Sequence, residues 1–128
     1  MKINDVELEA LDLNDYDNAV KWENALKNIQ DLKDRFNTMD ISKGSAVILD
    51  ICTAVKFVFE ELYGIDVVHE IFGDRNNMLE CMCAIDTLIT ETNKVDDKMQ
   101  QLLNKYNIKK VKYENNNRNF AKNNNYRR

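Results

Sequence analysis

Residues 45–64 read Ser45-Ala-Val-Ile-Leu-Asp-Ile-Cys-Thr-Ala-Val-Lys-Phe-Val-Phe-Glu-Glu-Leu-Tyr63-Gly64. Apolar residues recur in this stretch at steps of three and four, from Ile48 through Val55 to Leu62, which places them on one face of an α-helix. The segment is therefore predicted to be a core helix.

The apolar face of this helix is broader than that of a typical surface helix. Leu49, Cys52 and Phe57 extend it, so we expect other elements to contact the helix on more than one side, near the centre of the fold. Gly64 follows the last periodic residue and is expected to end the helix, because glycine adopts a positive φ without a Cβ penalty.

Two further helices are predicted after Gly64. A short one covers residues 67–72, with Asp66 as the N-cap. A long one starts after Asn77, which offers an N-cap acceptor three residues before Glu80, a variant of the capping box.

The apolar spacing of this last helix continues from Met78 to Tyr106 and is interrupted only at Thr92. A helix of roughly 28 residues spans about 40 Å. This is longer than a compact domain of 128 residues needs. Its distal half is therefore expected to project or to pair with a partner.

The N-terminal part combines a hairpin and a helix. Residues 1–13 alternate apolar and polar side chains around Asn4-Asp5, which is a weak β-hairpin pattern. A helix over residues 16–38 is predicted next, capped by Asn14 or Asp15. Its apolar stripe is Ala19, Trp22, Leu26, Ile29, Leu32 and Phe36.

The fold class is mainly α: an antiparallel bundle of three long helices and one short helix, with the small N-terminal hairpin. Proline is absent and there are only three glycines, which favours long helices over a turn-rich β fold. A linker over 39–44 is expected to end with Ser45 as the cap of the central helix. We predict one domain over 1–106 and a basic tail over 107–128.

Charge is distributed unevenly along the chain. Of its 18 basic and 22 acidic residues, seven basic and one acidic lie in 107–128, giving that tail a net charge of plus 6 and residues 1–106 a net charge of minus 10. The basic residues of the tail are Lys109, Lys110, Lys112, Arg118, Lys122, Arg127 and Arg128. They could contact nucleic acid, but docking on an acidic protein surface is favoured, because the acidic body would repel a duplex.

The sequence offers little for catalysis. His69 has no adjacent nucleophile, the three cysteines lie in apolar helical segments without metal-ligand spacing, and adjacent carboxylates on a helix diverge by about 100°. We expect no enzyme activity, cofactor or metal. The chain shows neither a secretory signal nor an apolar run long enough for a membrane span, so we expect a cytoplasmic protein without membrane contact.

The stretch Phe57-Val-Phe-Glu-Glu-Leu-Tyr-Gly64-Ile-Asp-Val-Val-His-Glu-Ile71-Phe72-Gly73-Asp-Arg-Asn-Asn-Met-Leu79-Glu-Cys81 resembles a family of small proteins from tailed phages and prophages of low-GC bacteria. The family pattern is an aromatic-rich helix, Phe-Gly, a short acidic segment, Ile-Phe-Gly, and then Asn, Leu and Cys opening the next helix. The N-terminal hairpin, the helix around Glu23-Asn-Ala-Leu26 and the arginine-ended C-terminus also resemble that family. The chain departs from it in two places: Asn-Asp stands where Asn-Gly is usual, and the tail is rich in asparagine.

The resemblance implies a tail assembly chaperone or accessory protein, because such genes lie beside those for the tail-tube and tape-measure proteins. Its partner would be one of these two proteins, and the resemblance carries over no catalytic residue. A small helical module with spare apolar stripes could keep a long amphipathic helix soluble.

Two other functions stay open at this stage. A phage inhibitor of a host defence nuclease, such as an anti-CRISPR protein, would use the acidic body to block a basic nucleic-acid channel. A weaker alternative is nucleic-acid binding through the tail, and a homo-oligomer is also compatible with the sequence.

Partner contacts are predicted on two helices. Trp22 and Phe36 lie on the first helix, and Met99, Leu103 and Tyr106 lie on the distal half of the last one. Such large apolar groups exceed what a thin domain edge can bury. For Trp22, a place in the core is the favoured alternative.

Overall fold

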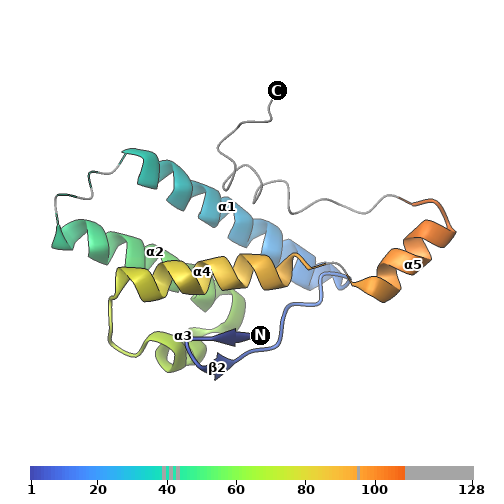
Figure 1. Ribbon diagram of the computed structural model, residues 1–128, viewed down its shortest axis with the longest axis horizontal. Coiled ribbons are helices and arrows are strands. Elements are labelled where there is room, and N and C mark those ends of the chain that lie inside the picture. Colours follow the sequence, from blue (N-terminus) through green and yellow to red (C-terminus); the bar gives the residue numbers. More distant parts are fainter. Residues whose placement is uncertain (39, 41, 43, 95, 109–128) are drawn as a thin grey trace.

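The computed structural model describes residues 1–38, 40, 42, 44–94 and 96–108, and this part of the chain is mainly helical (Figure 1). A two-stranded antiparallel sheet precedes five helices among these residues. The elements are β1 (Lys2–Ile3), β2 (Val6–Glu7), α1 (Tyr16–Thr38), α2 (Ser45–Tyr63), α3 (Ile65–Phe72), α4 (Met78–Thr92) and α5 (Asp97–Lys105).

The N-terminal hairpin is confirmed, with strands shorter than the 1–13 segment that predicted it. Ile3 pairs with Val6 across the turn. Asn4 and Asp5 form that turn with φ of 49° and 69°, the left-handed conformations that a tight two-residue hairpin loop requires. Ile3 is buried and joins the core, so the hairpin is held by packing as well as by its own hydrogen bonds.

Helix α1 has the predicted bounds, and Asp15 caps it. The Asp15 carboxylate accepts a hydrogen bond from the backbone N–H of Asn18 at 3.3 Å, which satisfies one of the free amides of the first turn. The apolar stripe of α1 faces inward, where Trp22, Leu26 and Ile29 are buried.

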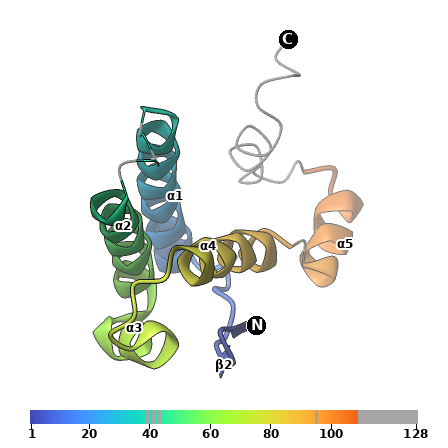
Figure 2. The ribbon, with the colours of Figure 1, turned by 60° about the vertical axis from the view of Figure 1, so that its left-hand side comes forward.

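Helix α2 is the centre of the fold, as its broad apolar face predicts. It packs against α1, α3 and α4, and α1 lies beside it in the opposite direction (Figures 1 and 2). Gly64 ends α2 with φ of 93° and donates to the carbonyl of Glu60 at 2.8 Å. The prediction that Ser45 caps α2 is wrong: Ser45 is the first helical residue, and the preceding Gly44 offers no capping side chain.

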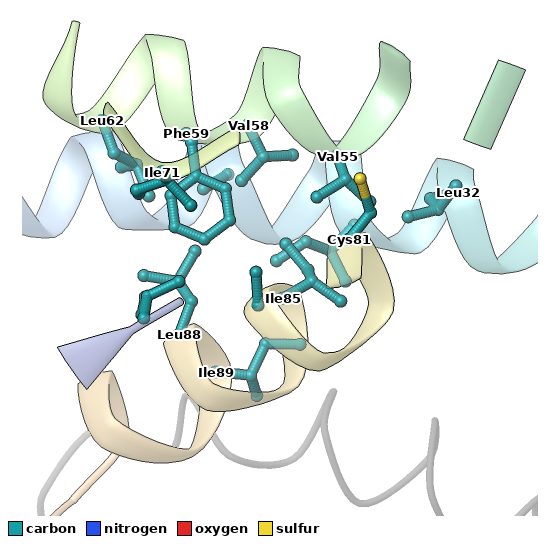
Figure 3. Close-up of a cluster of buried hydrophobic side chains, with 14 of the residues drawn as sticks. Leu32, Val55, Val58, Phe59, Leu62, Ile71, Cys81, Ile85, Leu88 and Ile89 are labelled. Carbon is teal, nitrogen blue, oxygen red and sulfur yellow. The ribbon is translucent and has the colours of Figure 1, made fainter. Parts of the chain in front are cut away.

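The core lies between α2 and the helices around it. Figure 3 shows Phe59 pointing from α2 towards Ile85 and Leu88 of α4. The ring of Phe59 also meets that of Phe72 edge to face, with centroids 5.6 Å apart and planes at 72°. Such aromatic pairs add to the free energy gained from burying their area alone.

The turn from α3 to α4 is fixed by polar contacts. The Asn77 side chain accepts from the backbone N–H of Glu80 at 2.9 Å, which confirms the predicted N-cap of α4. Lys56 of α2 donates to the carbonyl of Arg75 at 2.6 Å, tying this loop to the central helix. The predicted cap Asp66 lies instead in the first turn of α3, because α3 already starts at Ile65.

The prediction of one continuous helix over residues 78–106 is wrong. Helix α4 ends at Thr92, and Asp96 caps the separate helix α5 by accepting from the N–H of Met99 at 3.1 Å. At the break, the Trp22 indole N–H donates to the Asn93 side chain at 3.2 Å, which holds the end of α4 against α1. This contact and the Asp96 cap together favour a new helix direction over continuation.

The opposite exposure of two phenylalanines on α2 gives a test of the core. Phe59→Ala should lower the free energy of unfolding by about 3–5 kcal/mol, because it removes a fully buried ring from the core. Phe57→Ala is the matched control on the same helix, where the ring is 48% exposed, and should cost about 1 kcal/mol or less. Urea unfolding followed by circular dichroism measures both, and equal losses for the two variants would contradict this core assignment.

Candidate functional site

An open groove of about 550 Å³ lies between the C-terminal half of α1 and the middle of α2. Apolar atoms of Leu32, Ala54 and Phe57 line it. The polar lining residues are Asn28, Asp31, Asp34, Arg35, Asp50 and Thr53. The groove therefore combines apolar surface with a rim of charged and polar groups, as binding clefts for other molecules often do.

The rim of the groove is predominantly acidic. It carries three carboxylates and one guanidinium, and Arg35 lies 3.5 Å from Asp50, which links α1 to α2. Both side chains of this ion pair are nearly half exposed, so it contributes roughly 0–1 kcal/mol to stability. The Gln30 amide donates to Asp34 at 3.1 Å, which orients one carboxylate of the α1 side of the rim.

An apolar stripe on α2 continues out of the groove. Its apolar members are Leu49 and Phe57, which lie eight residues apart on one line along the helix, with the polar Thr53 between them. Leu49 is 53% exposed and Phe57 is 48% exposed. The prediction that neighbouring elements cover both side chains is therefore wrong. Leu49 also lines a second, smaller hollow of about 350 Å³ near Ser45 and Asn76, so the stripe connects two hollows.

Helix α5 is the second exposed apolar surface. Met99, Leu102, Leu103 and Tyr106 are spaced by three and four residues, which places them on one side of the helix and its last turn. No residue of α5 is buried, and Leu102 and Tyr106 are 42% and 63% exposed. Figure 2 shows α5 standing apart from the other helices.

The base of α5 is attached to the body at a few points. The Asn14 side chain donates to the Asp96 carboxylate at 3.1 Å, next to the segment that leads into α1. Three residues earlier in the chain, the indole N–H of Trp22 donates to the side chain of Asn93. These contacts fix where α5 starts and leave its apolar side free of the packed core.

The residues predicted for partner contact have different positions in the structure. Trp22 has no exposed surface and belongs to the core, where its indole N–H also has a partner, so its assignment as a contact residue is wrong. Phe36 is partly buried against the core. Met99 and Leu103 are partly exposed and Tyr106 is largely exposed, all on the same side of α5.

The basic residues of the tail lie outside the described part of the chain. These are Lys109, Lys110, Lys112, Arg118, Lys122, Arg127 and Arg128. Docking of this tail on an acidic surface therefore stays a prediction.

Sequence reasoning missed the groove. Its acidic side comes from Asp31 and Asp34, which on the sequence belong to the polar face of an ordinary amphipathic helix. Its apolar side includes Phe57, which the pattern assigned to a broad buried face. One signal was available. Leu49 and Phe57 are eight residues apart and lie on a different side of the helix from the core residues Ile51 and Val55.

The histidine and the candidate metal ligands can be placed within the described part of the chain. His69 is exposed on α3, and among the described residues no group of three or more histidine, cysteine or acidic side chains could hold a metal ion. No helix in this part of the chain has the length and apolar character to cross a membrane.

Cys52 and Cys81 form a buried pair of free thiols between α2 and α4, and Cys83 is exposed. Burial, together with a hydrogen bond to Cys52, raises the pKa of Cys81 to about 12. The thiolate is the reactive form of cysteine, so Cys81 is chemically inert in the folded protein.

Comparison with known proteins gives a family assignment. The model described as "Family of unknown function (DUF6673)" matches residues 4–127. The chain belongs to this family. The match extends from the hairpin through α5 into the tail, so the groove and α5 both lie within the DUF6673 region. No curated protein sequence and no solved structure matches the chain.

The three thiols should differ sharply in reactivity. At pH 8.5, iodoacetamide should modify Cys83 quickly and leave Cys52 and Cys81 unmodified, because burial shields both and a pKa near 12 leaves Cys81 on the order of a thousandfold fewer thiolates than a thiol of pKa 9. Peptide mass spectrometry of the native protein measures this difference. All three sites should react equally in urea, and rapid native modification of Cys81 would contradict its burial.

The raised pKa also predicts a pH dependence of stability. The folded protein retains the Cys81 proton where the unfolded chain loses it, so stability is unaffected below about pH 9 and decreases as the pH rises towards 12. The stability of a Cys81→Ala variant should decrease less over this pH range, because the variant lacks the contribution of the Cys81 thiol. Denaturant unfolding of both proteins between pH 7 and pH 10.5 measures this difference. If the free energies of unfolding of the two proteins change equally with pH, the raised pKa of Cys81 is contradicted.

Proposed function

We propose that this DUF6673 protein acts by binding another protein, and that the groove between α1 and α2 receives an amphipathic helix of that partner. The observation that carries the proposal is the exposed apolar line from Leu49 to Phe57, which runs beside an acidic rim on an otherwise well-packed body. Helix-in-groove recognition uses this combination: apolar anchors at helical spacing enter the groove and polar residues meet its rim.

The chemistry of the groove indicates the kind of helix that it would bind. Three carboxylates against one guanidinium favour a partner helix with lysine or arginine beside its apolar face. The apolar lining is open and shallow, which suits side chains spaced along a helix better than a small enclosed ligand. An extended helical protein would offer many such segments in succession.

The resemblance to phage tail-module proteins supports a specific role for this binding. We propose that the protein is a non-enzymatic tail assembly chaperone or accessory protein in the cytoplasm of a bacterial host, with a tape-measure or tail-tube protein as its partner. A small helical bundle that covers apolar stripes of a tape-measure helix would keep that helix soluble until assembly.

A second candidate function rests on the acidic surface. Glu60, Glu61, Asp66 and Glu70 are exposed around the corner between α2 and α3, in addition to the acidic rim of the groove. A phage inhibitor of a host nuclease could place these groups in a basic nucleic-acid channel. In that case the partner is a nuclease effector rather than a helical tail protein.

Affinity purification of the tagged protein from cells producing the corresponding phage, followed by mass spectrometry, tests the two candidates. Recovery of tape-measure or tail-tube protein would support the chaperone function. Recovery of a nuclease complex without tail proteins would overturn it in favour of the inhibitor.

The same experiment on variants tests the groove. The double substitution Leu49→Asp and Phe57→Asp should reduce recovery of the partner at least tenfold, because it places charges on the apolar line that contacts the helix. Ile65→Asp is the matched control: Ile65 is 48% exposed, like Phe57, but lies on α3 outside the groove. Equal recovery with the double variant would exclude the groove as the binding site.

A further inference from the structure

The chain itself contains a helix of the type that the groove would bind. No residue of α5 is buried, and the groove has no occupant among the described residues of this chain. We infer that α5 of one copy binds the α1–α2 groove of a second copy. This self-association is independent of the phage partner proposed above.

The apolar surfaces of α5 and the groove match in kind and extent. Leu102 and Leu103 lie at the middle of the exposed side of α5, between Met99 and Tyr106. From Met99 to Tyr106 this side is about 10 Å long, roughly two helical turns. The line from Thr53 to Phe57 in the groove covers about one turn, and its continuation to Leu49 covers a second.

The charges on the two surfaces are complementary. Lys98 and Lys105 lie seven residues apart, so both fall along the same edge of the apolar side of α5. Asp97, the acidic residue in the first turn of α5, lies on the opposite side of the helix. When α5 enters the groove, the two lysines can face Asp31 and Asp34 on the α1 side of the rim.

The position of α5 favours a second copy over its own groove. The hydrogen bond between Asn14 and Asp96 fixes the start of α5 beside the N-terminal end of α1. In Figure 1, α5 extends away from the body at this end, whereas the groove residues of α1 and α2 lie towards the α1–α2 loop. The apolar side of α5 is therefore presented to a neighbouring molecule.

If each copy donates its α5 to the other, both α5 helices and both grooves are covered. If α5 of each copy binds the groove of the other, two identical contacts related by a twofold axis close a dimer. The same groove would then be covered in the free protein and would open only when a partner helix displaces α5. The dimer would thus keep the apolar line covered.

Light scattering coupled to size exclusion, performed on the full-length protein, tests the inference. The wild-type protein should elute with twice the mass of one chain at micromolar concentration, and the variant Leu102→Asp with Leu103→Asp should elute with the mass of a single chain. Helix α5 contributes no buried residue, so the far-UV circular dichroism spectrum of this variant should match that of the wild type, which shows that the variant is folded. Leu79→Asp, at a residue 73% exposed on α4, is the control that should still form dimers.

Reversing the charges on α5 and on the rim of the groove, in separate variants, tests whether these two surfaces contact each other. Lys98→Glu with Lys105→Glu, and separately Asp31→Lys with Asp34→Lys, should each weaken dimerisation at least tenfold through like-charge repulsion at both contacts. A mixture of the two variants should form a heterodimer, since one contact is then native and the other has both charges reversed.

Three results would overturn the inference. They are a monomeric wild-type protein, a dimer that survives the Leu102 and Leu103 substitutions, and a mixture of the two charge variants that stays monomeric. The last result would mean that α5 binds its own groove or none. The α2 variants Leu49→Asp and Phe57→Asp should also lose the dimer, whereas loss of the phage partner alone would affect the proposed function and leave this inference intact.

Discussion

The packing of one helix against three others is the constraint on which the rest of this structure depends. Helix α2 must bury apolar side chains towards α1, α3 and α4 at once, so its sequence is apolar around much of its circumference. Phe59 lies at the centre of these contacts and meets Phe72, which positions α3 below the bundle. A helix with such a broad apolar face has limited room for polar residues, and the part of its face that no neighbour covers becomes the stripe from Leu49 to Phe57.

Local sequence signals predicted most helix ends because those ends are fixed by local chemistry. Asp15 and Asn77 accept backbone hydrogen bonds in the first turns of α1 and α4, and Gly64 adopts the positive φ that ends α2. Of the boundaries that failed, one lacks such chemistry, and the break before α5 combines a local cap by Asp96 with contacts between distant residues. Gly44 precedes α2 without a side-chain cap, and the break after Thr92 involves a hydrogen bond between Trp22 and Asn93, which are far apart in the sequence.

The candidate surfaces were harder to predict than the helices. Hydrophobic periodicity identifies the apolar residues of a helix, but it does not show which of them a neighbour will cover. This is why Trp22 was a candidate contact residue although it is buried, and why Phe57 was assigned to a buried face although it is half exposed. Leu102 and Tyr106 of the distal segment are exposed, although the prediction that this segment projects rested on one continuous helix, and the chain instead starts a separate helix at Asp97.

The separation of α5 from the core has a consequence for which parts of the chain tolerate substitution. No residue of α5 is buried, so substitutions on its apolar side change this surface with little effect on the free energy of folding. Changes in the groove are more restricted, since Leu32 and Ala54 line it while also packing within the body. The surface of this short helix can therefore vary in sequence while the rest of the molecule keeps its structure.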